Sequence, residues 1–323
     1  MNATLSLDLD NTWSYMKTHG DPGWETFPSY LDVVVPRFLT FLRERRLRIT
    51  VFVVGQDAAL EKNAEAIESI AAAGHEIGNH SFHHEPWLHT HTEAAIEEEI
   101  ARAEAAIEDV TGWRPHGFRG PGFTRSDAIF RVLARRGYLY DASTFPTFIG
   151  PLARAYYFRT ARLEGAARHE RDALFGKFTD GFARNRYYRV KTDAGLIGEL
   201  PVTTMPGLRI PIHVSYVLYL SVFSPALARR YFRFALTLCR LTNTEPSILL
   251  HPLDFLDGGD VPELRFFPAM NLPLERKLSV VADACEALRE TFTVRPLLEY
   301  VRDHGRTCAV LERKLIQPGD RPA

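Results

Sequence analysis

The sequence has little cysteine, no strong net charge and no long apolar run. Its three cysteines lack the paired spacing of a zinc finger or a disulfide framework, so we expect free thiols in a reducing compartment. The formal net charge is −1, which gives the chain as a whole no electrostatic basis for binding nucleic acid. No uninterrupted apolar stretch reaches the roughly 18 residues of a membrane-spanning helix. The start, MNATLSLDLD, has neither a basic segment nor a long apolar one, so we expect no secretory signal and a cytoplasmic location.

The first half of the chain alternates between strand-like and helix-like patterns. Short β-branched or alternating segments predict strands at residues 4–10, 48–55, 75–80, 117–123 and 138–144. Apolar residues at helical spacing predict helices at residues 30–47, 62–74, 92–112 and 126–137. Strict alternation of this kind predicts an α/β fold with a parallel sheet and outer helices.

The alternation is interrupted at about residues 150–195, which we interpret as an insertion. A strand-like segment (195–206), an apolar segment (210–220), two helices (224–242 and 274–291), a strand (246–255) and a last strand with a helical turn (292–305) follow. We therefore expect one catalytic domain over residues 1–313, with a disordered tail at residues 314–323.

Five predicted strands each end in an ionisable side chain. In a parallel α/β fold the carboxyl ends of the strands open on one face, where functional sites form. The strand-end residues are Asp8 and Asp10, His80 with His84 just beyond it, Arg119, Asp141 and His251.

Two of these strand ends together have the composition of a metal site. Asp8 and Asp10 are two residues apart, so a strand places both carboxylates on one face, where they repel unless a cation or a proton separates them. His80 and His84 are four apart, so a helical turn after the strand would bring both rings to one side. Two imidazoles and one carboxylate suit a hydrolytic divalent metal, and the second carboxylate is free to act as a base.

Each signal taken singly also has a purely structural explanation. Asp-x-Asp can cap a turn, Arg119 beside GPG can be a turn residue, Asp141 can cap the next segment, and His251 can be a hydrogen-bonded core residue. His75 fits packing within a strand, whereas His83, His89 and His91 fit exposed or supporting positions. The arrival of five such features in order, each at a strand end, favours the metal site.

The same ordered motifs resemble the polysaccharide deacetylase superfamily of NodB-like carbohydrate esterases, from about residue 4 to residue 300. GHEIGNHSFHH is similar to the second family motif, SLDLDNTW to the first, FRGPGF to the third, YDAST to the fourth and LLHP to the fifth. The first motif has the spaced Asp-x-Asp form of one branch, where the commonest form has adjacent aspartates. The fourth lacks the tryptophan of the common form. The resemblance implies a distorted (β/α)7-type barrel.

The resemblance also implies roles for single residues. Asp10, His80 and His84 would hold one divalent metal ion, most often zinc. Asp8 would be the general base, and Arg119 would pair with it and orient it. The spacing of the aspartates leaves open which is the base and which is the ligand.

The remaining implied roles concern the oxyanion and the leaving group. The backbone N–H of Gly122 would help to stabilise the oxyanion, and His251, oriented by Asp141, would protonate the departing amine. Together these roles predict a metal-dependent hydrolase that removes an N-acetyl or N-formyl group from an amino sugar.

A basic and aromatic segment suggests where such a substrate could lie. Residues 152–191 carry ten basic and four acidic residues, a local net charge of +6, with eight interleaved aromatic residues, and the apolar run 210–223 follows. Such segments are typical of peripheral contact with a membrane surface, which would fit a lipid-linked sugar precursor at the inner membrane. A lid over the barrel explains the segment equally well. The alternatives are a small-molecule amidohydrolase of allantoinase type and a non-catalytic sugar- or lipid-binding descendant.

Overall fold

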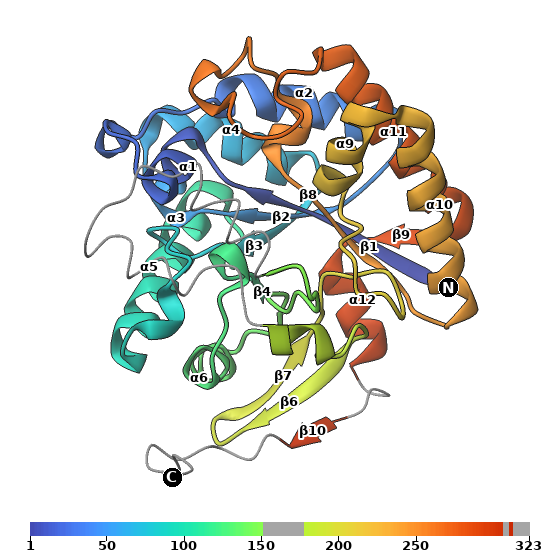
Figure 1. The fold of residues 1–323 in the computed structure, drawn as a ribbon. Coiled ribbons are helices and arrows are strands. Elements are labelled where there is room, and N and C mark those ends of the chain that lie inside the picture. Colours follow the sequence, from blue (N-terminus) through green and yellow to red (C-terminus); the bar gives the residue numbers. More distant parts are fainter. Residues whose placement is uncertain (151–177, 306–309, 313–323) are drawn as a thin grey trace.

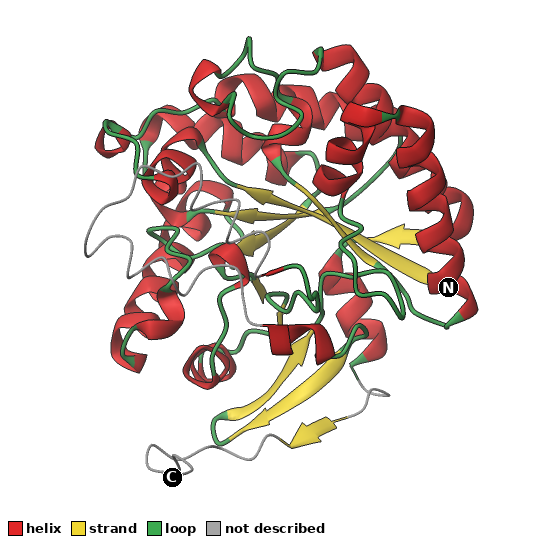
Figure 2. Cartoon of the chain, viewed as in Figure 1, coloured by secondary structure: helices red, strands yellow, loops and turns green. Residues whose placement is uncertain are grey.

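One curled sheet with helices packed along its outer side forms the body of the molecule (Figures 1 and 2). The computed structural model describes residues 1–150, 178–305 and 310–312. Its strands are β1 (Asn2–Leu9), β2 (Thr50–Val53), β3 (Glu76–Asn79), β4 (Gly117–Phe118), β5 (Tyr140–Asp141), β6 (Tyr188–Thr192), β7 (Gly195–Glu199), β8 (Ser247–Leu250), β9 (Thr293–Arg295) and β10 (Val310–Glu312). Its helices are α1 (Thr12–His19), α2 (Leu31–Glu44), α3 (Gly55–Ala58), α4 (Glu61–Ala72), α5 (Glu93–Thr111), α6 (Asp127–Arg135), α9 (Val214–Phe223), α10 (Pro225–Leu241), α11 (Leu274–Thr291) and α12 (Leu297–His304).

The sheet is parallel except at one pair of strands. Its order is β10-β6-β7-β5-β4-β3-β2-β1-β8, with β9 also paired to β1, and only β6 and β7 are antiparallel. The predicted α/β fold of distorted-barrel type is therefore confirmed. Along this sheet β3, β2 and β1 are neighbours, so the ends of β1 and β3 are separated by a single strand.

The chain after β7 brings the two sides of the curled sheet together. The Val202 N–H donates to the carbonyl of Thr144 after β5 (2.8 Å), and the Thr203 N–H donates to the carbonyl of Ser247 at the start of β8 (2.9 Å). The Ser247 N–H in turn donates to the Thr203 hydroxyl (2.8 Å).

Strand β1 shows why the interior of the curl is polar. Leu5, Leu7 and Leu9 are buried in the core cluster that includes Val34 and Phe38 of α2. The alternate side chains of a strand point the other way, and here they are polar: Thr4, Ser6 and Asp8, all buried. The apolar face holds the helices, so the polar face is free to build a site.

The predicted helices form with small shifts of their ends, whereas the predicted strands 117–123, 138–144 and 246–255 form only the shorter β4, β5 and β8. Thr92 and Ser126 cap α5 and α6 by accepting from backbone N–H groups, and Gly112 ends α5 in a left-handed conformation. The apolar segment 210–220 forms much of α9, and β6 lies within the span that we interpret as an insertion. Residues 152–177 of the basic segment lie outside the described residues. None of the helices in the described ranges is long and apolar enough to cross a membrane.

Candidate metal centre

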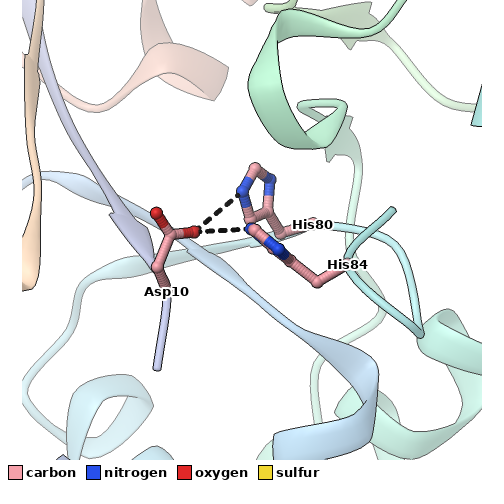
Figure 3. A group of neighbouring side chains, drawn as sticks. All are labelled: Asp10, His80 and His84. Carbon is pink, nitrogen blue, oxygen red and sulfur yellow. Dashed lines mark hydrogen bonds and ion pairs between the residues drawn. The ribbon is translucent and has the colours of Figure 1, made fainter. Parts of the chain in front are cut away.

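Asp10, His80 and His84 meet at the carboxyl end of the sheet (Figure 3). Asp10 directly follows β1 and His80 directly follows β3. One ligand atom from each residue lies within 4.8 Å of the others, and all three side chains are buried. The carboxylate oxygen Oδ1 of Asp10 is 2.8 Å from His84 Nε2 and 3.3 Å from His80 Nε2. The structure thus brings together the three predicted metal ligands.

The backbone between the two histidines differs from the predicted helical turn. Ser81 and His84 both have positive φ angles, 60° and 52°, and no helix forms between them. The loop is held instead by Glu99 of α5, whose Oε1 accepts from the Phe82 and His83 N–H groups. An irregular loop therefore brings the rings together, with centroids 5.1 Å apart.

The hydrogen bonds around the cluster prepare His80 to bind a cation. His80 Nδ1 donates to the carbonyl of Arg119 (2.6 Å). A carbonyl can only accept, so the proton sits on Nδ1 and Nε2 faces Asp10 as a potential ligand atom. This kind of outer hydrogen bond fixes the tautomer and ring orientation of metal-binding histidines.

Electrostatics keep the carboxylate charged. Burial alone would raise the pKa of Asp10, but the charge of His84 and hydrogen bonds to both histidines hold it well below its ordinary value. Burial lowers the pKa of His84 despite Asp10. For His80 the opposing effect of burial is outweighed by Asp10 and Asp8, so its pKa is raised. A buried set with one carboxylate and two imidazole nitrogens fits a divalent ion of the zinc type.

Asp8 lies beside this cluster and is held by Arg119. Arg119, fully buried, donates from Nη1 to Asp8 Oδ1 (2.7 Å) and to Ser6 Oγ (2.8 Å), and from Nε to the carbonyl of Ala142 (2.9 Å). Its guanidinium also stacks over the Phe52 ring at 4.4 Å. The predicted Arg119–Asp8 pair is thus present, and it orients the carboxylate that is not in the metal cluster.

The turn that contains Gly122 packs against the histidine loop. Gly122 has φ 57° and ψ 23° inside a 3-10 turn over Pro121–Phe123. A Cβ atom there would lie 2.9 Å from the Pro86 side chain, so both the backbone conformation and the close contact require glycine. The turn therefore lies directly against the loop that carries His84.

The structure departs from the prediction that Asp141 orients His251. Asp141 accepts from the Ser143 hydroxyl (2.6 Å), and Ser143 Oγ accepts from the N–H of Gly120 (2.8 Å). Asp141 also shares a hydrogen bond with Glu199 of β7. The strand order explains the difference, because β5 pairs with β4 and β7, whereas His251 follows β8. Asp141 therefore supports the Gly120–Gly122 turn.

Two residues that the sequence motifs did not indicate hold His251. The hydroxyl of Ser215, in α9, is 3.0 Å from His251 Nδ1 and donates to Asp254 Oδ1 (2.8 Å). The other oxygen of Asp254 accepts from the His251 N–H (2.9 Å). The spacing His-x-x-Asp in LLHPLDF was the available signal for Asp254, whereas Ser215 lies in an apolar segment with no motif.

A small cavity joins the metal cluster to His251. Its volume is about 140 Å³. The polar lining residues are Asp10, His213, Ser215, His251, Asp254 and Lys277, and the apolar ones are Tyr15, Leu218, Tyr219, Leu253, Phe267, Pro268 and Ala269. A group held next to Asp10 can therefore contact His251.

Comparison with known proteins shows which family part of the chain matches. Residues 18–140 match the family described as "Polysaccharide deacetylase". The chain is 30% identical over 128 residues to a peptidoglycan deacetylase of Helicobacter pylori, an alignment that covers 40% of this chain and 41% of that protein. It is 31% identical over 110 residues to a peptidoglycan-N-acetylmuramic acid deacetylase of Bacillus subtilis, an alignment that covers 34% of this chain and 41% of that protein. Residues 18–140 of the chain therefore belong to the polysaccharide deacetylase family.

The fold comparison extends over the whole chain. A solved structure from Mycobacterium smegmatis, classed with the polysaccharide deacetylases, matches 100% of this chain and 96% of its own with a TM-score of 0.61 and 21% identity. The alignments to the two curated relatives span about two fifths of the length of those proteins. The matched family region, residues 18–140, contains His80, His84 and Arg119. Asp8, Asp10 and His251 lie outside that region, and the fold brings them to the same site.

Proposed function

We propose that the protein is a metal-dependent hydrolase that removes an N-acyl group, acetyl or formyl, from an amino sugar. The observation that carries the proposal is the buried Asp10–His80–His84 cluster beside an Arg119-held Asp8, with His251 across a shared cavity. A divalent ion held by the cluster would lower the pKa of a bound water and polarise the amide carbonyl.

The chain's own groups would carry out the proton transfers. Asp8, held by Arg119 in an orientation that leaves the metal cluster intact, would accept the proton of the attacking water. The backbone N–H of Gly122 would stabilise charge on the carbonyl oxygen. His251, held by Ser215, would give a proton to the departing nitrogen.

The direct test is turnover of an N-acetylglucosamine oligomer by protein stripped of metal and then reloaded with zinc. Acetate release that appears with one equivalent of metal, and is absent from the His80→Ala/His84→Ala variant, supports the proposal. His83→Ala is a matched control, because His83 belongs to the same loop but pairs with Glu99 outside the cluster. A metal-loaded protein that binds one equivalent of zinc yet releases no acetate or formate from any N-acyl amino sugar would contradict it.

A lipid-linked sugar at a membrane surface is the finer part of the proposal. Most of the apolar run 210–223 is packed inside the protein as α9, but the end of α9 and the outer side of α10 expose apolar side chains: Val222, Phe223, Leu227, Phe234 and Leu241. Exposed arginines follow the same helix, among them Arg230 and Arg240. Apolar and basic side chains on one helix surface favour contact with anionic lipid.

Sedimentation with anionic vesicles tests this finer part. Wild-type protein should bind at low salt and less as salt rises, because the attraction of basic residues to the surface is screened. Phe223→Asp/Leu227→Asp should bind less while it keeps its metal. Absence of vesicle binding at low salt, with good turnover of a water-soluble acylated amino sugar, would restrict the function to a soluble substrate.

A further inference from the structure

His213 is a buried histidine in the cavity with no structural task that explains its polarity. It immediately precedes α9, where a side chain often caps the helix, but it makes no capping hydrogen bond. The residue is 4% exposed, and its Nδ1 is buried with no hydrogen-bonding partner among residues 1–150, 178–305 and 310–312. An unpaired buried polar atom destabilises a protein by about 1–3 kcal/mol, so such a residue needs another explanation.

The surroundings of His213 keep its ring neutral. Burial, followed by the charges of His251 and Arg119, holds the pKa of His213 well below its ordinary value. A neutral imidazole carries one N–H. Placing that proton on Nδ1 would bury an unpaired N–H, so the ring's hydrogen-bond donor is Nε2.

The position of His213 connects it to the site of reaction. Its ring lines the same cavity as Asp10 and His251, and its centroid lies 5.8 Å from that of His251 in an edge-to-face arrangement. Phe145 and Tyr216 flank the ring at 5.4 and 4.6 Å, which fixes its orientation. The ring is therefore a rigid, uncharged polar group next to the predicted proton donor.

We propose that His213 is a substrate-positioning residue that donates a hydrogen bond to a neutral oxygen, a sugar hydroxyl, of the acylated sugar bound in this cavity. This inference rests on the proposed function. A neutral donor beside the acidic side chains Asp10 and Asp254 favours an uncharged ligand over an anion, and the ammonium of Lys277 in the same lining already donates to the carbonyls of Leu253 and Leu256. The volume of about 140 Å³ is below the roughly 300 Å³ at which drug-sized sites begin, so the cavity takes one small group while the rest of a longer substrate lies outside.

The test compares His213→Leu and His213→Gln with wild type, all loaded with zinc. Binding of an N-acetylglucosamine oligomer is measured by calorimetry, hydrolysis by acetate release, and stability by thermal unfolding. His213→Leu should keep one equivalent of zinc and a Tm within about 3 °C of wild type, because no hydrogen bond joins the His213 ring to the part of the chain that the structure describes. Its affinity and kcat/KM for the oligomer should fall about tenfold, the loss expected for one hydrogen bond. His213→Gln restores a donor and should recover part of the affinity.

The outcomes separate this inference from the proposed function. Unchanged binding by His213→Leu, or a large loss of Tm in both variants, would overturn the positioning role. If wild type still hydrolyses the oligomer in that case, the proposed hydrolase function stands. If wild type binds the oligomer without hydrolysing it, and His213→Leu binds it more weakly, the positioning role is upheld and the proposed hydrolase function is refuted. If wild type neither binds nor hydrolyses the oligomer, both proposals fail. His83→Leu, a histidine outside the cavity, is the matched control.

Discussion

At the scale of single residues, Asp8 and Asp10 differ through their partners. Asp10 faces two imidazoles, whereas Asp8 faces a guanidinium that also binds Ser6 and the carbonyl of Ala142. A divalent ion can replace the protons shared with imidazoles but cannot displace a fully buried arginine. The surroundings therefore favour Asp10 as the ligand and Asp8 as the base, a choice that the spacing of two residues alone left open.

This division predicts opposite results for two equivalent substitutions. Asp8→Asn should keep one equivalent of zinc and lower kcat by about 10²–10⁴-fold, the usual contribution of a general base. Asp10→Asn should lose zinc at the same free concentration. Metal content by atomic absorption and acetate release measure the two effects. Loss of zinc from Asp8→Asn with retention by Asp10→Asn would reverse the assignment.

The hydroxyl of Ser215 is predicted to act only through His251. Ser215→Ala removes the group between His251 Nδ1 and Asp254 Oδ1 and leaves a buried carboxylate oxygen without its donor. We expect zinc content to be unchanged, kcat to fall about tenfold or more, and the pH profile of kcat to shift, because the ring loses its fixed tautomer. Ser215→Thr, which keeps the hydroxyl, should restore much of the rate. A Ser215→Ala enzyme with the wild-type pH profile would exclude a positioning role.

At the scale of elements, β5 and β7 bury two carboxyl groups side by side. Burial raises the pKa of Glu199 well above its ordinary value, and the charge of Asp141 raises it further. Burial also raises the pKa of Asp141, so both shifts favour a proton held between the two carboxyl groups in the folded protein. Thr144 donates its N–H to Glu199 Oε1 (2.8 Å), so this pair also ties the chain after β5 to β7.

The buried pair predicts a pH-dependent stability. A group whose pKa is raised by folding contributes fully below its unfolded pKa, about 4.3 for glutamate, and this contribution is lost as the pH rises towards the folded pKa. Glu199→Gln has an amide that can donate to Asp141 at any pH. Urea unfolding between pH 5 and 8 should show wild type losing stability relative to Glu199→Gln as the pH rises. A constant difference across that range would show that Glu199 is ionised in the folded state.

At the scale of the whole molecule, the parts that could be predicted from the sequence are those set by local patterns. Caps such as Thr92 and Ser126, and the strand-end positions of Asp8 and His80, follow from spacing and composition. The partners of His251 and Asp141 depend on which strands are neighbours. That order follows from how the whole sheet curls, which no local pattern contains. The left-handed backbone at His84 depends in the same way on Glu99, from a distant helix.

Because the metal cluster joins the ends of β1 and β3 across β2, metal binding should stabilise the whole fold. A ligand that binds only the folded state adds RT ln(1 + [L]/Kd), about 2.7 kcal/mol at a hundredfold excess over Kd. For a domain of this size we expect zinc to raise the Tm of metal-free protein by at least several degrees. The two histidines must be neutral to bind it, so the increase should shrink as the pH falls below the ordinary histidine pKa of about 6.5. Calorimetric scans of wild type and His80→Ala/His84→Ala, with and without zinc, measure this. The double variant should melt at the same temperature in both conditions, and an equal zinc-induced rise in both proteins would place the ion elsewhere.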